Sequence, residues 1–551
     1  MADSDIRVVS AIGKLKKIKI KNFGTTYSGY AYAHKATPNE IFANTDWQEY
    51  EGRFKTPTVL KYDDNFKLEN WGAPALTERP KKKGKNTSKK PVELFKLHLG
   101  SAEKKPTLPS GLDYKTAITD YLRELTKSLK STLENRWPMV DFYSQVCIII
   151  TIPAEFDATA MATMRTCAQK AGLIQQKDSP NLLFTTEPEA AAIHCMKALK
   201  EHDLGVGDTF MVVDCGGGTV DLTTRKLLTG KKLSEITERE GDYCGGSYVD
   251  QEFLKFLGRK VGSSAIDLVK QNHYGQLQYM VQEFCRKIKI PFTGDEAEFK
   301  PVELDLEDVC PVLQQYVRGQ AKEEMEDAEW LVNIEFEDVK SMFDPVVGKI
   351  IRLIHNQLNK SEEDCSVMFL VGGFSESKYL QTRIRQEFNS IVRNIPVPPN
   401  PIVAIVKGAV QFGLTQEVIE DRVLKWTYGI DWTPDDPPER KSGKHIIIFE
   451  RLGKKGERVA VDQKVLRIFA PTSIIQEYAS LDLYVTTKDD AKFCDEPDVN
   501  MLDTFNFHIP ITGDEMRPIL YVMKFGMVEI QTTAVNVATG EKYEKTFEFD
   551  I

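Results

Sequence analysis

Apolar and polar positions in the first three quarters of the chain follow two different periods. Val146–Ile152 (VCIIITI) and Leu182–Thr186 are short apolar runs of the length expected for buried strands. Residues 115–136 instead carry Ile, Tyr and Leu at three- and four-residue spacing, which predicts an amphipathic helix. Strands that alternate with helices in this way are typical of α/β layers around a largely parallel sheet.

The pattern changes near residue 443. From there on, short runs such as LDLYVTT and TFNFHIPI alternate apolar with polar residues and are separated by turn residues, which predicts an all-β sandwich. We therefore expect an α/β domain over residues 1–420, a linker over residues 421–442, and a smaller β-sandwich domain over residues 443–551. Val423 and Leu424 are apolar linker residues that could dock in a groove or simply end a helix.

Residues 211–222, which read MVVDCGGGTVDL, predict a strand, a glycine turn and a returning strand. Three adjacent residues without a Cβ allow backbone N–H groups to approach a phosphate. Asp214 and Asp221 bring carboxylates to the same place, which suits a hard cation such as Mg²⁺ between carboxylate and phosphate. The simpler alternative is a hairpin that needs glycine only for its turn.

Residues 18–31 (IKIKNFGTTYSGYA) repeat this layout. Asn22 aligns with Asp214, Gly24 aligns with Gly216, and small residues and a strand follow in both stretches. One glycine turn would be a weak signal, but two in the same order predict two halves of similar build that face one ligand.

Glu187 stands where the strand Leu182–Thr186 passes into a predicted helix. In open α/β sheets the ligand crevice usually lies at this junction, and a carboxylate there could orient a water for phosphoryl transfer. The alternative is that Glu187 only stabilises the start of the helix.

Five motifs in a fixed order resemble the seventy-kilodalton heat-shock family of the actin-like ATPase superfamily. They are the two glycine turns, TTEPEAAAIHC (185–195), YCGGSYVD (243–250) and VGGFSES (371–377), and residues 400–409 resemble the helix that closes the family's nucleotide domain. The wording FGTTYSGYA and VGGFSES is similar to the divergent branch that lacks a helical lid. The last strands also resemble the family's peptide-binding β-domain, and since Ile551 ends the last run, no lid is expected after them.

The resemblance implies an actin-like, two-lobed domain with ribonuclease-H-like duplicated halves that hold ATP or ADP with Mg²⁺ between them. Glu187, Asp214 and Asp221 would form the catalytic set, and Asp214 would hold the metal through water. The nucleotide-binding residues that it implies are Asn22, Gly24, Thr25, Thr26, Tyr27, Gly216, Gly217, Gly218, Thr219, Gly245, Gly246, Lys289, Gly372, Gly373 and Ser375.

The chain departs from the family pattern at four places. Asn22 replaces an Asp, no Lys stands near residues 71–76 where the family uses one to reach the phosphates, Glu376 replaces an Arg against the adenine, and Ile402 replaces an acidic residue. A neutral amide weakens metal binding and cannot accept a proton. We therefore expect nucleotide binding with slow or absent hydrolysis.

The composition of the chain limits the kinds of partner and the cellular location that are expected. The net charge of −9 argues against nucleic acid as the main partner, and no apolar run approaches the ~20 residues of a membrane span. The nine cysteines form no CxxC pair, and the N-terminus has no signal-peptide core, so a cytoplasmic protein is expected. The Lys-rich residues 78–91 could act as a nuclear address, although a solvated insertion is the simpler interpretation.

Two interpretations of function remain open. The first is a divergent chaperone ATPase whose β-domain binds polypeptide clients, with possible co-chaperones. The second is a nucleotide-binding scaffold without turnover, whose β-domain is a protein-interaction module. A sugar kinase is a weaker third option, because the β-rich C-terminal quarter argues against it.

Overall fold

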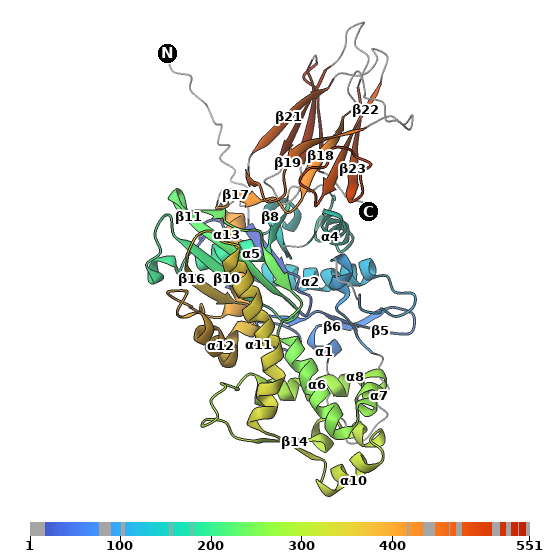
Figure 1. The fold of residues 1–551 in the computed structure, drawn as a ribbon. Helices are drawn as coiled ribbons and strands as arrows, with labels where there is room; N and C mark the ends of the chain where they lie inside the picture. Colours follow the sequence, from blue (N-terminus) through green and yellow to red (C-terminus); the bar gives the residue numbers. More distant parts are fainter. Residues whose placement is uncertain are drawn as a thin grey trace.

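The computed structural model shows a large α/β portion and a smaller β portion beyond it (Figure 1). In Figure 1 the α/β portion runs from blue through green and yellow to amber, and the β portion is orange to red. The structure describes residues 17–76, 90–100, 105–153, 156, 158–177, 179, 181–415, 418–432, 447–461, 463–469, 477–509, 518–524, 531–537 and 539–546.

The first sheet has the strand order β3-β2-β1-β8-β9, and β4 also pairs with β2. Three of its strands are parallel: β1 pairs with β8, and β8 pairs with β9. β2 is antiparallel to β1. The strands are β1 (Lys17–Asn22), β2 (Tyr27–His34), β3 (Phe42–Ala43), β4 (Thr56–Pro57), β8 (Val146–Ile152) and β9 (Leu182–Thr186).

β8 is buried along its whole length because helices cover both faces of this sheet. Ile148 and Ile150 belong to the core that includes α2 (Tyr114–Arg136) and α4 (Ala158–Lys170). Ile149 belongs instead to a core on the opposite face, with α5 (Glu187–Cys195) and α13 (Ala404–Thr415). A strand covered on both faces needs no polar alternation, which explains the continuous apolar run in the sequence.

The second sheet has the order β12-β11-β10-β16, with β13 also paired to β11. β10 is antiparallel to β11 and parallel to β16, the same pairing that β1 makes with β2 and β8. The strands are β10 (Thr209–Cys215), β11 (Val220–Leu228), β12 (Lys232–Glu235), β13 (Glu240–Asp242) and β16 (Cys365–Val371).

Helices α5 and α13 form the layer between the two sheets. The core around them contains Ile149 of the first sheet as well as Phe210 and Val212 of the second. The far face of the second sheet packs on α6 (Ser247–Val261) and α11 (Phe336–Asn359). The glycine turn of each sheet is therefore held in position by the same pair of helices.

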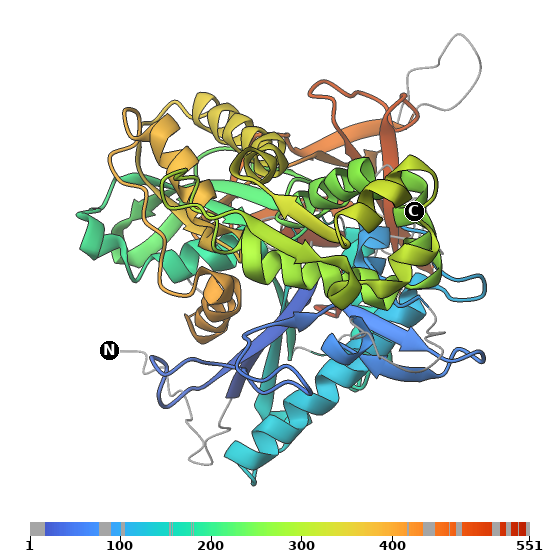
Figure 2. The ribbon, with the colours of Figure 1, turned by 90° about the horizontal axis from the view of Figure 1, so that it is seen from below.

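Smaller elements extend from each sheet; in Figure 2, which is seen from below, those of the first half are blue and those of the second run from green through yellow to amber. Those from the first half are β5 (Val59–Tyr62), β6 (Leu68–Trp71), α1 (Ala73–Leu76), β7 (Val92–Glu93) and η1 (Phe95–Leu99). Those from the second are α7 (Ser263–Asn272), α8 (Tyr274–Phe284), the π-helical η4 (Cys285–Lys289), β14 (Val302–Asp305), α9 (Leu306–Val309), η5 (Pro311–Gln315), α10 (Gln320–Asp327), β15 (Leu331–Ile334) and α12 (Lys378–Phe388).

The C-terminal portion is a sandwich of two four-stranded antiparallel sheets. Leu483 and Phe507 of one sheet share a core with Tyr521 and Met523 of the other. One sheet has the order β19 (Ile448–Gly453), β18 (Thr427–Trp432), β22 (Tyr478–Thr486), β23 (Val499–His508). The other has the order β21 (Lys464–Phe469), β24 (Ile519–Lys524), β25 (Gln531–Asn536), β26 (Lys542–Thr546).

The stretch expected as a linker contains two strands. β17 (Asp421–Val423) pairs with β20 (Arg458–Ala460), and β18 already belongs to the sandwich. Leu424, considered above for docking, is 6% exposed and packs in the sandwich core. Residues 433–442 lie outside the described part of the chain, as does nearly all of the Lys-rich stretch 78–91. Among the described residues, no helix is both long enough and apolar enough to cross a membrane.

Candidate functional site

The two glycine turns line one cavity of about 1680 Å³ between the halves of the α/β portion. Gly24, Thr25, Thr26 and Tyr27 come from the turn between β1 and β2, and residues 216–219 come from the turn between β10 and β11. Both turns therefore face the same space, as the repeated sequence layout predicts.

The two turns also touch each other. A Cβ on Gly217 would lie 2.3 Å from Thr26 Oγ1, so glycine is needed where the turns meet. Thr58 fixes the first turn, since its hydroxyl donates to the Gly24 carbonyl at 2.8 Å and its N–H donates to the Thr26 carbonyl. In the second turn the Gly216 N–H donates to the Thr219 carbonyl at 2.9 Å.

Substitution of Gly217 by Ala is expected to force the turns apart and to lower both the thermal stability and the affinity of the cavity for nucleotide. The neighbouring Gly218→Ala is the matched control for stability, since its nearest neighbour would lie at 3.8 Å, an ordinary contact. Thermal unfolding compares the two. Equal melting temperatures would show that the contact with Thr26 is not restrictive.

A buried cluster of carboxylates lies beside the second turn. Ligand oxygens of Glu187, Asp214 and Asp221 lie within 4.8 Å of one another. Asp214 and Asp221 are register partners on β10 and β11, and Glu187 is the first residue of α5. The helix start is fixed by a capping box between Thr186 and Glu189, with Pro188 in the first turn.

The cluster fits a hard divalent cation. Burial, and then the nearby Glu187 carboxylate, raise the pKa of Asp214 to about 7, while Lys55 acts in the opposite direction. Asp214 Oδ1 is buried and has no hydrogen-bond partner among the described residues. A Cβ on Gly372 would come within 2.3 Å of this oxygen. Oxygen ligands around an unsatisfied carboxylate are what Mg²⁺ binds, so these residues could hold it, in part through water.

Two lysines from segments outside residues 71–76 lie near the carboxylate cluster or line the cavity. Lys96 on η1 is 2% exposed, and its ammonium lies 3.3 Å from Glu187 Oε1. A second cation, Lys55, lines the cavity itself. The stretch 71–76 has no lysine, as stated above, and these two come from other segments of the first half. Neither lysine carries a local sequence signal, because each reaches the site from a separate segment.

Other predicted residues line the second half of the cavity. Gly246, Lys289, Gly372 and Gly373 face it. The Lys289 ammonium donates to the Gly246 carbonyl and to Asp250 Oδ1, both at 2.6 Å, so it braces this wall through protein contacts.

Ser375, Gly245 and Asp221 are not among the residues that line the cavity. Ser375 donates to the Val371 carbonyl at 2.6 Å, and the Gly245 N–H donates to the Gly218 carbonyl. Asp221 reaches the site through the carboxylate cluster described above. The backbone of Asn22 pairs with Gly29 and Thr151 at the end of β1. Glu376 and Ile402, which depart from the family pattern, do line the cavity.

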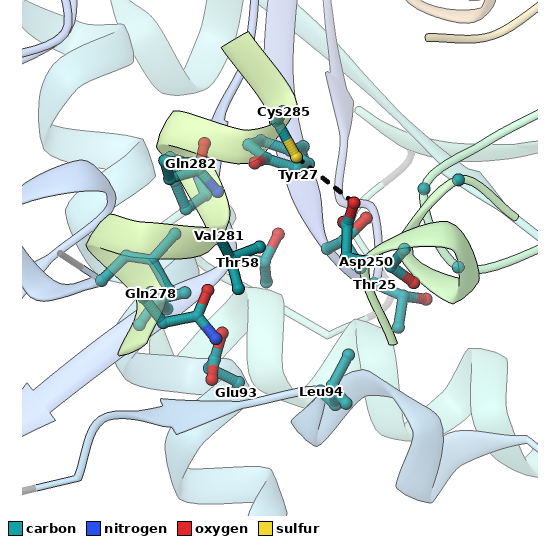
Figure 3. A pocket seen from close by; sticks show the side chains of 18 of the residues that line it. Thr25, Tyr27, Thr58, Glu93, Leu94, Asp250, Gln278, Val281, Gln282 and Cys285 are labelled. Atoms are coloured by element: carbon teal, nitrogen blue, oxygen red, sulfur yellow. Dashed lines mark hydrogen bonds between the residues drawn. The ribbon is translucent and has the colours of Figure 1, made fainter. Parts of the chain in front are cut away.

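The cavity continues beyond the first turn into the region shown in Figure 3. Tyr27 and Thr58 of the first half face Gln278, Val281 and Gln282 of α8. Burial raises the pKa of Tyr27, so its hydroxyl stays protonated at neutral pH. Asp250 accepts from Cys285 Sγ at 3.2 Å on the same side.

No family model matches the chain. Human Heat shock 70 kDa protein 12A is 26% identical over 96% of this chain and 90% of its own length, and human Heat shock 70 kDa protein 12B is 25% identical over the same shares. Chaperone protein DnaK of Mycoplasma mobile is 24% identical over 74% of this chain and 61% of its own length. This near full-length similarity and the order of the motifs both support the resemblance to the seventy-kilodalton heat-shock family, in its divergent branch.

Proposed function

We propose that the chain is a divergent chaperone-type ATPase that binds ATP or ADP with Mg²⁺ in the cavity between its two halves. The observation that carries this proposal is the meeting of two glycine turns beside a buried carboxylate oxygen that lacks a partner. Backbone N–H groups of the turns bind phosphate oxygens, and Asp214 with Asp221 holds Mg²⁺ through water. The named relatives are heat-shock and chaperone proteins, which supports the same class.

Hydrolysis on this proposal is slow. Glu187 orients the attacking water, and Lys96 holds its carboxylate and adds positive charge near the phosphates. Asn22 offers an amide where the family has an Asp, so the site has one carboxylate fewer for the metal and the water. Losing one positioned group typically costs roughly 10²-fold or more in rate.

The proposal extends to the whole chain. The α/β portion, residues 1–420, consists of duplicated halves, and the sandwich over residues 443–551 binds polypeptide clients. Arg422, at the junction, forms an ion pair with Glu189, two residues from Glu187 on α5. This contact offers a physical route by which nucleotide state and client binding influence each other. A cytoplasmic location with access to co-chaperones fits this role.

A second function is favoured by particular residues. Glu376 and Ile402 line the cavity where the family has an Arg and an acidic side chain, and Asn22 removes a carboxylate. A non-hydrolysing scaffold that binds nucleotide and uses its β-domain for protein interaction would carry these same changes.

One experiment separates the two functions. ATP is titrated into the full chain by calorimetry with and without Mg²⁺, and phosphate release is followed over hours for the native chain, Asn22→Asp and Glu187→Gln. We expect Mg²⁺-dependent binding, slow release, and an increase of roughly tenfold or more in Asn22→Asp. Glu187→Gln controls for contaminating phosphatase. Native turnover as fast as that of a DnaK assayed beside it would contradict slow hydrolysis, and no release from any variant would favour the scaffold.

A further inference from the structure

Lys55 is held over the strand pair that carries the first glycine turn. It precedes β4, which pairs with β2 through Thr56 and Ser28. A Cβ on Gly29 would lie 3.2 Å from Lys55 Cγ, so the stem of this lysine packs on the backbone of β2. Gly29 is in turn the register partner of Asn22. The stem of Lys55 therefore lies beside the strand pair whose first strand ends at Asn22.

The ammonium of Lys55 lies in a field of carboxylates but pairs with none. Burial lowers the pKa of Lys55, and the negative charges of Asp214 and Glu187 are the main opposing influence. Among the residues that the structure describes, it has no ion-pair or hydrogen-bond partner. Lys96, by contrast, is already paired with Glu187. The two lysines are thus in different situations, and only Lys55 is available to a ligand.

An unpaired charge at a partly buried position is costly for the protein alone. Asp214, from the second half, lines the same cavity, and its buried Oδ1 is also without a partner among the described residues. A positive and a negative group line the same cavity, and neither has a partner. This arrangement indicates that a bound ligand provides a partner for each of them. A phosphate bound to a metal ion does so, since its oxygens accept from the ammonium while the cation lies against the carboxylate.

We propose that Lys55 binds the terminal phosphate of the nucleotide and makes the cavity prefer a triphosphate to a diphosphate. This inference rests on the proposed nucleotide site. The terminal phosphate is the expected partner because Asp214 and Glu187, assigned above to the metal and the attacking water, are the strongest negative influences on Lys55. A carboxylate in place of Asn22 would help to hold a metal ion and its positive charge near the phosphates. In this chain the ammonium of Lys55 supplies part of that positive charge instead.

The test compares Lys55→Met with the native full chain by calorimetry at one fixed Mg²⁺ concentration. The probes are a non-hydrolysable ATP analogue and ADP. We expect the affinity for the triphosphate to fall about 10- to 100-fold, the range of a hydrogen bond to a charged group, and the affinity for ADP to change by less than about threefold. Lys55→Arg keeps the charge and should restore most of the triphosphate affinity.

Lys90→Met is the matched control. Lys90 also lines the cavity, but its ammonium lies 5.3 Å from the centre of the Tyr274 ring, away from the carboxylate cluster. The Lys90→Met substitution removes the same charge, and it should lower the affinities for the ATP analogue and for ADP slightly and to the same extent. Thermal unfolding without nucleotide gives a second readout, because removing an unpaired ammonium should leave the melting temperature unchanged or raise it.

The outcomes separate this inference from the function on which it rests. If the native chain binds neither probe, the nucleotide site itself is wrong. If the native chain binds both probes and Lys55→Met lowers the two affinities to the same extent, the assignment of Lys55 to the terminal phosphate is overturned. The same holds if Lys55→Met lowers neither affinity. A melting temperature that falls in Lys55→Met would show a structural role instead.

Discussion

Replacement of Glu189 by Gln is expected to lower the free energy of unfolding by about 3–5 kcal/mol, the usual cost of breaking a buried ion pair from one side. Glu189 is fully buried and accepts from Arg422 Nε at 2.5 Å and from Arg239 Nη2 at 2.9 Å. Arg225, also fully buried, pairs with Glu235 at 3.0 Å in the same cluster. Without Glu189, the guanidiniums of Arg422 and Arg239 would each lose a buried carboxylate partner.

The pKa of Glu189 supports the sign of this prediction. Burial would raise it, but Arg422, Arg239 and Arg225 outweigh burial and hold the pKa well below its usual range. A carboxyl whose pKa is lower in the folded state stabilises the fold above its unfolded pKa of about 4.3 and loses this contribution as pH falls toward the folded value. The stability of the native chain should therefore fall more steeply below about pH 4 than that of Glu189→Gln.

Chemical denaturation followed by fluorescence measures the effect. Glu252→Gln is the matched control, because its ion pair with Lys255 is on the surface and should matter by less than roughly 0.5 kcal/mol. Arg422→Met added to Glu189→Gln should recover part of the loss, since it removes one of the buried charges that Glu189 offsets. A loss below about 1 kcal/mol for Glu189→Gln would mean that water or rearrangement satisfies the arginines.

Substitution of Gly408 by Ala should be at least as damaging. Gly408 lies on α13 where this helix crosses α5, and a Cβ there would lie 1.6 Å from the Ala190 carbonyl oxygen and 3.1 Å from the His194 nitrogen. The obstacle is backbone, so the two helices must separate. We expect a loss of about 3 kcal/mol or more, beyond the usual range for an overpacked core.

Gly348→Ala provides the control on another helix. Only the tip of Arg352 would lie near its Cβ, at 3.7 Å, so helix propensity should raise stability by up to about 1 kcal/mol. Because α5 begins at Glu187, a Gly408→Ala chain that still folds should also lose nucleotide affinity. If Gly408→Ala and Gly348→Ala are equally stable, helices α5 and α13 do not cross as closely as described.

Much of the fold is readable from local sequence. The strand Val146–Ile152 is seen with the bounds that its apolar run predicts, and the helix predicted over residues 115–136 begins one residue earlier, at Tyr114. Both follow from apolar periodicity, which is a property of neighbouring residues. The two glycine turns were recognisable for the same reason, since residues within a few positions of each other define a turn.

Groups that reach the site from distant segments left no such signal. Lys96 is on a short helical turn and meets Glu187 across 91 positions of sequence, and Arg422 meets Glu189 across 233. The family pattern has a lysine near residues 71–76, where this chain has none, and the sequence predicts a linker over residues 421–442. In the structure, the cations of the site come from residues 55 and 96, and the expected linker begins with a strand anchored by Arg422.

The sequence by itself determined the long buried strand, the amphipathic helix, the paired glycine turns and the carboxylates beside them, because each depends on residues close together in the chain. Only the tertiary structure decided which cations face those carboxylates, why Gly217 and Gly408 cannot carry a side chain, and how the β portion is attached. These depend on the packing of α5 and α13 between two sheets, which brings distant backbone segments within contact distance and leaves no periodic trace in the sequence.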